Sequence, residues 1–161
     1  MAAFLPACGP DHPSSDSLQE EFEANRVTFE KLADMAAQDC NYSRISYDFT
    51  HPNWDLPEQE QPGDPSEQRW QSYRDLFDEL DLESGVTIFS NGEWIELNRS
   101  SDGLLTAGSS LSFIRAPRSQ LKNGYKIISS EKPLECELGD KGVCRVAHHL
   151  EDDWYLALER H

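Results

Sequence analysis

Apolar residues recur at helical spacing in two segments of the N-terminal half of the chain. In the first segment, Ser17 and Glu20 form a capping box, in which the hydroxyl accepts from a free backbone N–H and the carboxylate reaches back. This pattern predicts a helix over residues 18–38, after a flexible tail at residues 1–16. The apolar stripe of this helix consists of Leu18, Phe22, Phe29, Leu32, Ala33 and Ala36.

The second helical segment opens with three start signals. Asp64 suits the N-cap, Pro65 suits the first helical position, and Glu67 lies three residues after the cap. Gly85 ends the segment. The apolar stripe of this helix consists of Trp70, Tyr73, Leu76, Phe77 and Leu80.

Between the two helices, residues 44–49 alternate in polarity and predict a strand. Residues 51–63 contain Pro52, Pro57 and Pro62 and predict a loop. We expect Trp54 and Leu56 to hold this loop against the body of the domain, because they are its large apolar side chains.

From Val86 onward, the apolar period changes from 3.6 to 2, which predicts strands. The alternating runs cover residues 86–90, 93–97, 111–115, 125–129, 134–138, 143–149 and 154–159. Turn signals fall at residues 102–103, 123–124, 139–142 and 151–153. Short connections at regular spacing favour an antiparallel meander over β–α–β units.

The strongest turn signal is Asn91-Gly92, which predicts a hairpin with Ile88 opposite Ile95 and Phe89 opposite Trp94. The whole pattern predicts a single α+β domain over residues 17–161. In this domain, two N-terminal helices pack on an antiparallel β-meander of about six strands.

Acidic side chains are concentrated in the first half of the 161 residues, which carry a net charge of −16. Residues 1–82 hold 18 acidic and 5 basic residues, a net charge of −13, and residues 83–161 hold 12 and 9, a net charge of −3. Such a field repels nucleic acid and anionic membranes and attracts basic partners. Solubility alone is the alternative explanation of this charge.

Two acidic groups are candidate partner-binding residues. In the proline-rich loop, an aromatic anchor lies among carboxylates, at Trp54, Asp55, Glu58 and Glu60. The last turn of the second helix carries Asp78 and Glu79, and Asp81 follows. Negative charge at a helix C-terminus opposes the helix dipole, so helix stability does not explain this second group.

Cys136 and Cys144 flank the turn signal at residues 139–142. In a hairpin they would lie opposite or diagonal to each other, so a disulfide forms if the compartment is oxidising. Two buried, reduced thiols are the alternative. Cys40 has no partner nearby in sequence, and none of the cysteines has zinc-type C-x-x-C spacing.

The segment Leu5-Pro6-Ala7-Cys8-Gly9 is similar to the end of a bacterial lipoprotein signal, in which the cysteine is lipidated. Pro6 is atypical at its position, and residues 1–4 are too short for the charged and apolar regions of such a signal. A disordered tail with an unmodified cysteine is the alternative.

Three further patterns contain residue types that occur in catalytic or ligand-binding sites, but none predicts a catalytic residue, a cofactor or a metal. The cluster at residues 148–153 contains His148 and His149, but neighbouring strand residues face opposite sides, which favours a solvated turn. Residues 103–110 match neither a nucleophile elbow nor a phosphate-binding loop. Five basic residues are interpreted as exposed residues at the rim of the sheet rather than as a nucleic-acid surface. They are Arg115, Arg118, Lys122, Lys126 and Lys132.

Four segments carry a likeness to a known group of proteins: residues 69–77 with Trp70 and Tyr73, residues 103–109, Gly124-Tyr125, and residues 154–160. Together they resemble small, uncharacterised bacterial cell-envelope lipoproteins, and Cys8 fits that resemblance. It implies a similar architecture and a location in the envelope or periplasm, with the cytoplasm as the alternative. Because the group has no established activity, the resemblance assigns no catalytic residue.

We therefore expect a non-enzymatic, acidic binding protein of the immunity or inhibitor type, which occludes a basic toxin or enzyme. Nucleic acid is not expected as a partner, and a membrane only through a lipid anchor on Cys8. One alternative is a structural envelope lipoprotein. The other is an enzyme of unfamiliar type, with its site around Ser109, Ser110, His148 and His149.

Overall fold

The computed structural model describes residues 12–104, 107–136 and 142–161, which form an α+β fold. The helical elements are α1 (Ser15–Gln38), the 3-10 turn η1 (Glu58–Glu60), α2 (Glu67–Glu79), the 3-10 turn η2 (Ser90–Gly92) and α3 (Arg118–Leu121). The strands are β1 (Tyr42–Ile45), β2 (Thr50–Pro52), β3 (Val86–Phe89), β4 (Trp94–Leu104), β5 (Ala107–Arg115), β6 (Lys126–Ile128), β7 (Cys144–His149) and β8 (Trp154–Arg160). The predicted α+β class is confirmed, but the described residues form eight strands rather than about six.

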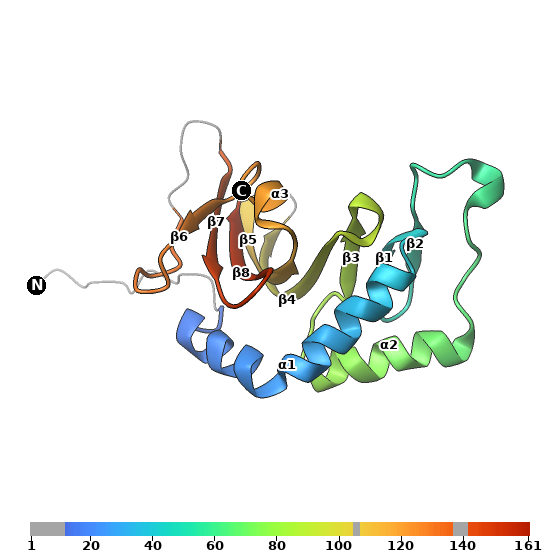
Figure 1. The fold of residues 1–161 in the computed structure, drawn as a ribbon, viewed down its shortest axis with the longest axis horizontal. Coiled ribbons are helices and arrows are strands. Elements are labelled where there is room, and N and C mark those ends of the chain that lie inside the picture. Colours follow the sequence, from blue (N-terminus) through green and yellow to red (C-terminus); the bar gives the residue numbers. More distant parts are fainter. Residues whose placement is uncertain (1–11, 105–106, 137–141) are drawn as a thin grey trace, which may run out of the picture.

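The eight strands of the described residues form one sheet, in the order β2-β1-β3-β4-β5-β8-β7-β6 (Figure 1). The meander is correctly predicted from β3 to β5, where consecutive strands are antiparallel neighbours. It is wrong beyond β5, because β8 lies between β5 and β7, and β6 pairs with β7 in parallel. A parallel pair needs a crossover, and local alternation of side chains does not reveal one.

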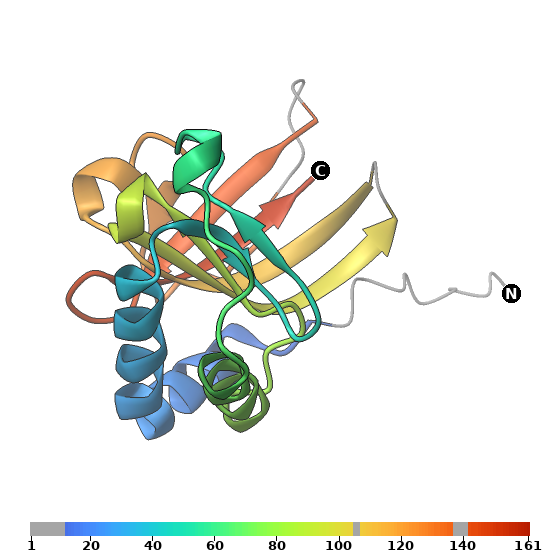
Figure 2. The same ribbon diagram turned by 90° about the vertical axis from the view of Figure 1, so that its right-hand side faces the viewer.

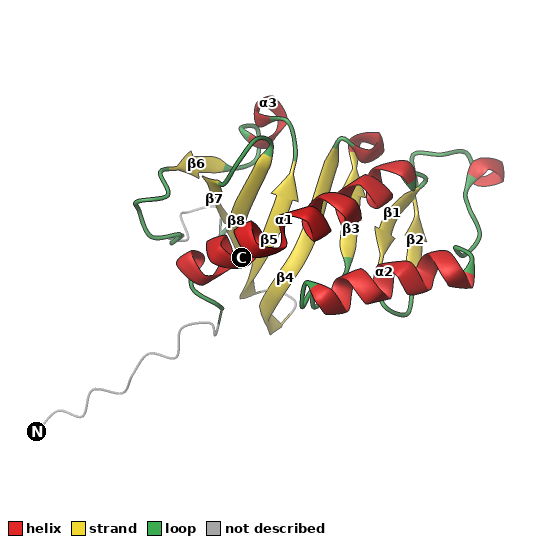
Figure 3. Cartoon of the chain, turned by 60° about the horizontal axis from the view of Figure 1, so that its bottom comes forward, coloured by secondary structure: helices red, strands yellow, loops and turns green. Residues whose placement is uncertain are grey.

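α1 and α2 lie together on one face of the sheet, which we call the helix face (Figures 2 and 3). Phe113 of β5 points into the main core on this face. The next residue, Ile114, points to the opposite side, where it belongs to a smaller core with Leu121 of α3. We call this opposite side the outer face.

Four buried aromatic rings attach α1 to the centre of the sheet. Phe22 and Phe29 of α1 pack against Phe113 and Trp154, with ring centroids 4.5–6.0 Å apart. The indole N–H of Trp154 also donates to the Glu30 carboxylate at 2.8 Å. Tilted and edge-on aromatic pairs add to the stabilisation from buried area.

Both helices have a different N-cap from the predicted one. The hydroxyl of Ser14 accepts from the Ser17 N–H, so α1 starts inside the segment predicted as a tail. The hydroxyl of Ser66 accepts from the Arg69 N–H, two residues after the predicted cap at Asp64. The predicted and the observed caps are all residue types that are favourable at an N-cap. Residue type alone therefore does not determine where each helix starts.

The predicted strand over residues 44–49 is replaced by a hairpin of β1 and β2, closed by the Ser46 N–H donating to the Phe49 carbonyl at 2.9 Å. The hairpin at Asn91-Gly92 has the predicted register, with Ile88 opposite Ile95 and Phe89 opposite Trp94. Asn91 and Gly92 both have positive φ, which explains why this turn is readable from sequence.

Two other expectations for the sheet are wrong. β4 continues through the predicted turn at residues 102–103 and pairs with β5 up to its last residue. Residues 134–136 of the predicted strand over 134–138 are irregular, and residues 137–138 lie outside the described residues.

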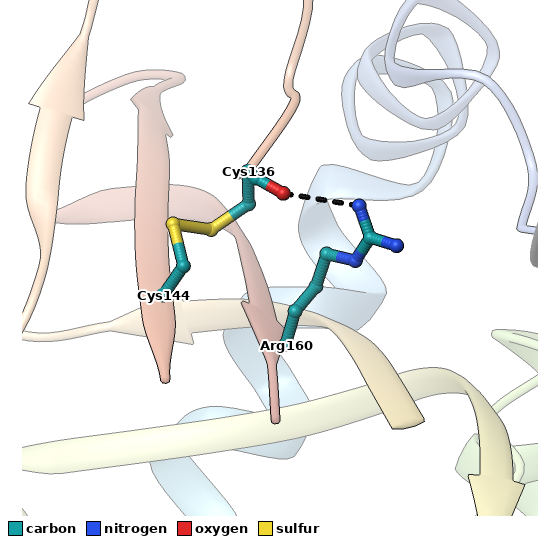
Figure 4. The surroundings of a disulfide bond; sticks show 3 residues. All are labelled: Cys136, Cys144 and Arg160. Carbon is teal, nitrogen blue, oxygen red and sulfur yellow. Dashed lines mark hydrogen bonds between the residues drawn. A yellow bond between two sulfur atoms is a disulfide. The ribbon is translucent and has the colours of Figure 1, made fainter. Parts of the chain in front are cut away.

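Cys136 and Cys144 form a disulfide, with their Cα atoms 5.8 Å apart (Figure 4). Cys136 does not belong to a strand. The bond therefore joins an irregular segment to the start of β7 and does not link two paired strands. Nη1 of Arg160 in β8 donates to the Cys136 carbonyl at 3.0 Å. Cys40 is a free cysteine.

We expect Cys136→Ser to lower the free energy of unfolding by about 2.5 kcal/mol, since the bond closes a short loop in the unfolded chain. Denaturant titration with and without a reductant measures this loss. Cys40→Ser is the matched control and should change stability little under both conditions. Equal stability of the oxidised and reduced protein would contradict the prediction.

Candidate functional site

The segment between β2 and α2 extends away from the sheet at one end of the molecule (Figure 1). We call residues 53–61 the acidic projection. It contains η1 and carries three of the six predicted partner-binding carboxylates, at Asp55, Glu58 and Glu60.

Hydrogen bonds hold the acidic projection at its start and within itself. The Asn53 N–H donates to the Asn41 carbonyl at 2.7 Å, and the Asn53 side chain accepts from the Asp55 N–H at 3.1 Å. Further along, the Gln61 side-chain amide donates to the Leu56 carbonyl at 3.3 Å. A segment with such bonds, with Pro57 inside it and Pro52 and Pro62 at its two ends, loses less conformational entropy on binding.

The acidic projection displays its aromatic side chain rather than burying it. Trp54 is 68% exposed, so the expectation that it holds the loop against the body is wrong. Asp55, Glu58 and Glu60 are also exposed, and none of the three forms an ion pair with any residue that the structure describes. An exposed tryptophan between unpaired carboxylates is a free contact surface.

The second acidic group, at the end of α2, is also exposed, but each of its carboxylates has a partner in the same molecule. Asp78 accepts from the Tyr47 hydroxyl at 3.1 Å, and Glu79 accepts from the Thr28 hydroxyl at 2.8 Å. Asp81 pairs with Arg99 at 2.8 Å. These partners offset the unfavourable helix dipole, so the group has a structural explanation that the sequence did not show.

The contact with Asp78 changes the pKa of the Tyr47 hydroxyl. Burial raises the pKa of Tyr47 to about 12, and the hydrogen bond to Asp78 adds to the rise. The phenol therefore stays protonated and remains a donor to this carboxylate.

The two acidic groups do not form one surface. The acidic projection leads into the start of α2, and Asp78 to Asp81 lie at its end. A helix of 13 residues is about 20 Å long, so it keeps the groups apart.

The structure also divides the predicted basic group. Arg115 lies on the helix face and pairs with Glu30 and Asp34 of α1, at 3.2 and 2.7 Å. Arg118 belongs to α3, which covers the outer face. Arg115 and Arg118 therefore do not share one basic surface.

The four residues of the alternative enzyme site are not brought together. His148 is buried on β7, while its neighbour His149 is exposed, as strand alternation requires. Ser109 and Ser110 likewise point to opposite faces of β5.

Ser109 instead contacts a histidine that sequence reasoning missed. The ring nitrogens of His12 lie 2.6 Å from the Ser100 hydroxyl and 2.7 Å from the Ser109 hydroxyl. Burial lowers the pKa of His12, although Asp102 and Glu83 partly oppose this. His12 precedes its partners by 88 and 97 residues, so no local pattern could identify the contact.

The half-buried His12 and the buried His148 predict acid sensitivity. Burial holds the pKa of His12 and His148 below the usual 6.5, so the unfolded chain takes up protons first as the pH falls. Stability should therefore be highest above pH 6.5 and decrease as the pH falls below it.

Thermal unfolding across this pH range measures the effect. His148→Leu should flatten the acid side of the profile, and His149→Leu is the matched control because that side chain is exposed. A profile that His148→Leu leaves unchanged would contradict this assignment.

The described residues show neither a group of metal ligands nor a membrane-spanning helix. They contain no group of three or more His, Cys, Asp or Glu side chains placed to hold a metal ion. Within the same ranges, no helix is long and apolar enough to cross a membrane.

Comparison with known proteins identifies no relative. The chain matches no family model, and no curated protein or solved structure shows significant similarity to it. The acidic projection is therefore interpreted from its own geometry.

Proposed function

We propose that the protein is a non-enzymatic binding protein of the immunity or inhibitor type, which docks on a basic protein through the acidic projection. The observation that carries this proposal is Trp54, exposed to 68% among three carboxylates without ion pairs in the described residues. Large exposed aromatic side chains are common anchors of protein interfaces.

Binding proceeds in two stages. The net charge of −16 steers a basic partner toward the protein, over a range of about 8 Å at physiological salt. Trp54 then inserts into a pocket of the partner. Asp55, Glu58 and Glu60 pair with Lys and Arg side chains of the partner, and the bound protein excludes the partner's substrate.

We further propose that the protein works in the bacterial envelope or periplasm. The disulfide between Cys136 and Cys144 supports an oxidising compartment. Cys8, which would carry a lipid anchor, lies outside the described residues.

The first test is capture from the native cell. The tagged full chain is incubated with cell extract, washed at low and at high salt, and the retained proteins are identified by mass spectrometry. We expect one basic protein that is retained at low salt and depleted at high salt.

A pair of matched variants makes this test specific. Glu58→Lys with Glu60→Lys changes the acidic projection, and Glu20→Lys with Glu131→Lys makes the same charge change at exposed positions elsewhere. We expect only the first variant to lose the captured protein. Loss in both variants, or in neither, would contradict docking through the acidic projection.

A further inference from the structure

The outer face of the sheet is only partly covered. Leu121 and Tyr125 cover the region over β5, β7 and β8, where they form the smaller core with residues such as Ile114 and Tyr155. A cavity of about 340 Å³ lies next to this covered region, between Tyr125 and the turn after Phe89. We call it the outer-face pocket.

Three aromatic side chains line the outer-face pocket. The ring of Trp94 lies 6.1 Å from that of Phe89 and 6.1 Å from that of Tyr125. Phe89 is 46% exposed, although its cross-strand partner is a tryptophan. Aromatic rings attract cations through their faces, and more strongly where water is excluded.

One of the two carboxylates in the outer-face pocket is fully engaged. Glu159 accepts from Arg145 at 2.7 Å and from the Tyr125 hydroxyl at 3.2 Å, and lies 2.8 Å from the His161 ring. Burial tends to raise the pKa of Glu159, but the bond to Arg145 outweighs it and the pKa is lowered. This carboxylate is therefore charged and already paired.

The other carboxylate, Glu96, forms no ion pair with any residue that the structure describes, although Arg145 also lines the pocket. Among the described residues, its one donor is the Ser112 hydroxyl, at 2.9 Å. Burial raises the pKa of Glu96, and the negative charge of Glu159 adds to the rise. The Ser112 bond and the positive charges of Arg145 and Arg44 lower it in part. A partly buried carboxyl without an ion-pair partner is unfavourable for folding, and such groups occur where a ligand supplies that partner.

We propose that the outer-face pocket binds an organic cation, an alkylammonium or alkylguanidinium group that pairs with Glu96 and packs its stem against Trp94 and Phe89. The negative field of the protein favours this ligand over an anion. The cation has two sources with the same chemistry, a free small amine and a Lys or Arg side chain of a protein. This inference does not depend on the proposed docking of the acidic projection.

The test uses the full-length chain and simple probes. Butylammonium and butylguanidinium are titrated while the Trp94 indole N–H signal is followed by NMR, with 1-butanol and methyl glucoside as uncharged comparators. We expect a saturable shift with the two cations and at least a tenfold weaker effect of the neutral probes. No saturable shift, or an equal shift with butanol or the glucoside, would overturn the proposal.

Three variants separate the role of Glu96 from general charge. Glu96→Gln should weaken cation binding at least tenfold, whereas Glu93→Gln, an exposed neighbour with the same change, should not. Glu96→Gln should fold, because the raised pKa shows that the fold favours the neutral form. Phe89→Ala should weaken binding as well, and it removes an exposed ring that folding does not need. Unchanged binding in Glu96→Gln would overturn the proposal.

The two sources are then distinguished with the captured basic protein. If Glu96→Gln also loses that protein, the cation is one of its side chains, and if capture is retained, the ligand is a free amine. The amine titration stands whether or not a partner is captured, so failure of the docking proposal leaves this result intact.

Discussion

Trp54→Ala is expected to weaken binding of the captured basic protein by about 30-fold, equivalent to about 2 kcal/mol. The side chain is 68% exposed in the free protein, so most of its surface is available for burial in an interface. The free energy of unfolding should change by less than about 0.5 kcal/mol, because exposed side chains contribute little to stability. Calorimetric titration and denaturant unfolding measure the two quantities.

Phe49→Ala is the matched control for Trp54. Phe49 is also an exposed aromatic residue, at 39%, but it lies on the hairpin between β1 and β2, where Arg44 and His51 contact its ring. We expect wild-type affinity for this variant. If Trp54→Ala binds as tightly as Phe49→Ala, Trp54 is not the anchor.

Phe29→Ala is expected to lower the free energy of unfolding by about 4 kcal/mol. Phe29 is completely buried, and its ring lies 4.5 Å from Phe113 and 5.3 Å from Phe22. Removal of the ring leaves a cavity where α1 meets the sheet, and the surrounding rings cannot all move to fill it.

Val27→Ala, two residues earlier on α1, is the control for this loss. Val27 is 83% exposed, so its truncation removes almost no buried contact. We expect less than about 0.5 kcal/mol of change. A small effect of Phe29→Ala in the same denaturant titration would contradict the attachment of α1 through this aromatic group.

Sequence reasoning succeeded where structure depends on neighbouring residues. The register of the β3–β4 hairpin follows from Asn91-Gly92, because both residues take the positive φ that this turn requires. The helices α1 and α2 follow from apolar stripes with a period of 3.6.

Features that depend on distant residues were missed. The contact of His12 with Ser109 joins residues 97 apart. The outer-face pocket combines Glu96 of β4 with Glu159 of β8. The alternation of polarity predicts that each side chain faces outward, but it does not predict that the two lie in one pocket. The parallel pairing of β6 with β7 likewise has no local signature.

The two groups of candidate partner-binding residues are all exposed, but they differ in their contacts. The carboxylates beside Trp54 form no ion pair within the described residues, whereas Asp78, Glu79 and Asp81 contact Tyr47, Thr28 and Arg99. The acidic residues at a helix end can be identified from the sequence, but the residues that contact them cannot, because they belong to other elements. Reversal of the second group should therefore affect stability before it affects binding.

The most direct test of docking through the acidic projection is the association rate constant with the captured basic protein, measured by stopped-flow fluorescence at several salt concentrations. We expect the rate constant of the wild type to fall at least about tenfold between 50 and 300 mM salt, since exposed charges are screened. Glu58→Lys with Glu60→Lys should associate more slowly and respond less to salt than Glu20→Lys with Glu131→Lys. The same rate constant and salt dependence in both variants would contradict docking through the acidic projection.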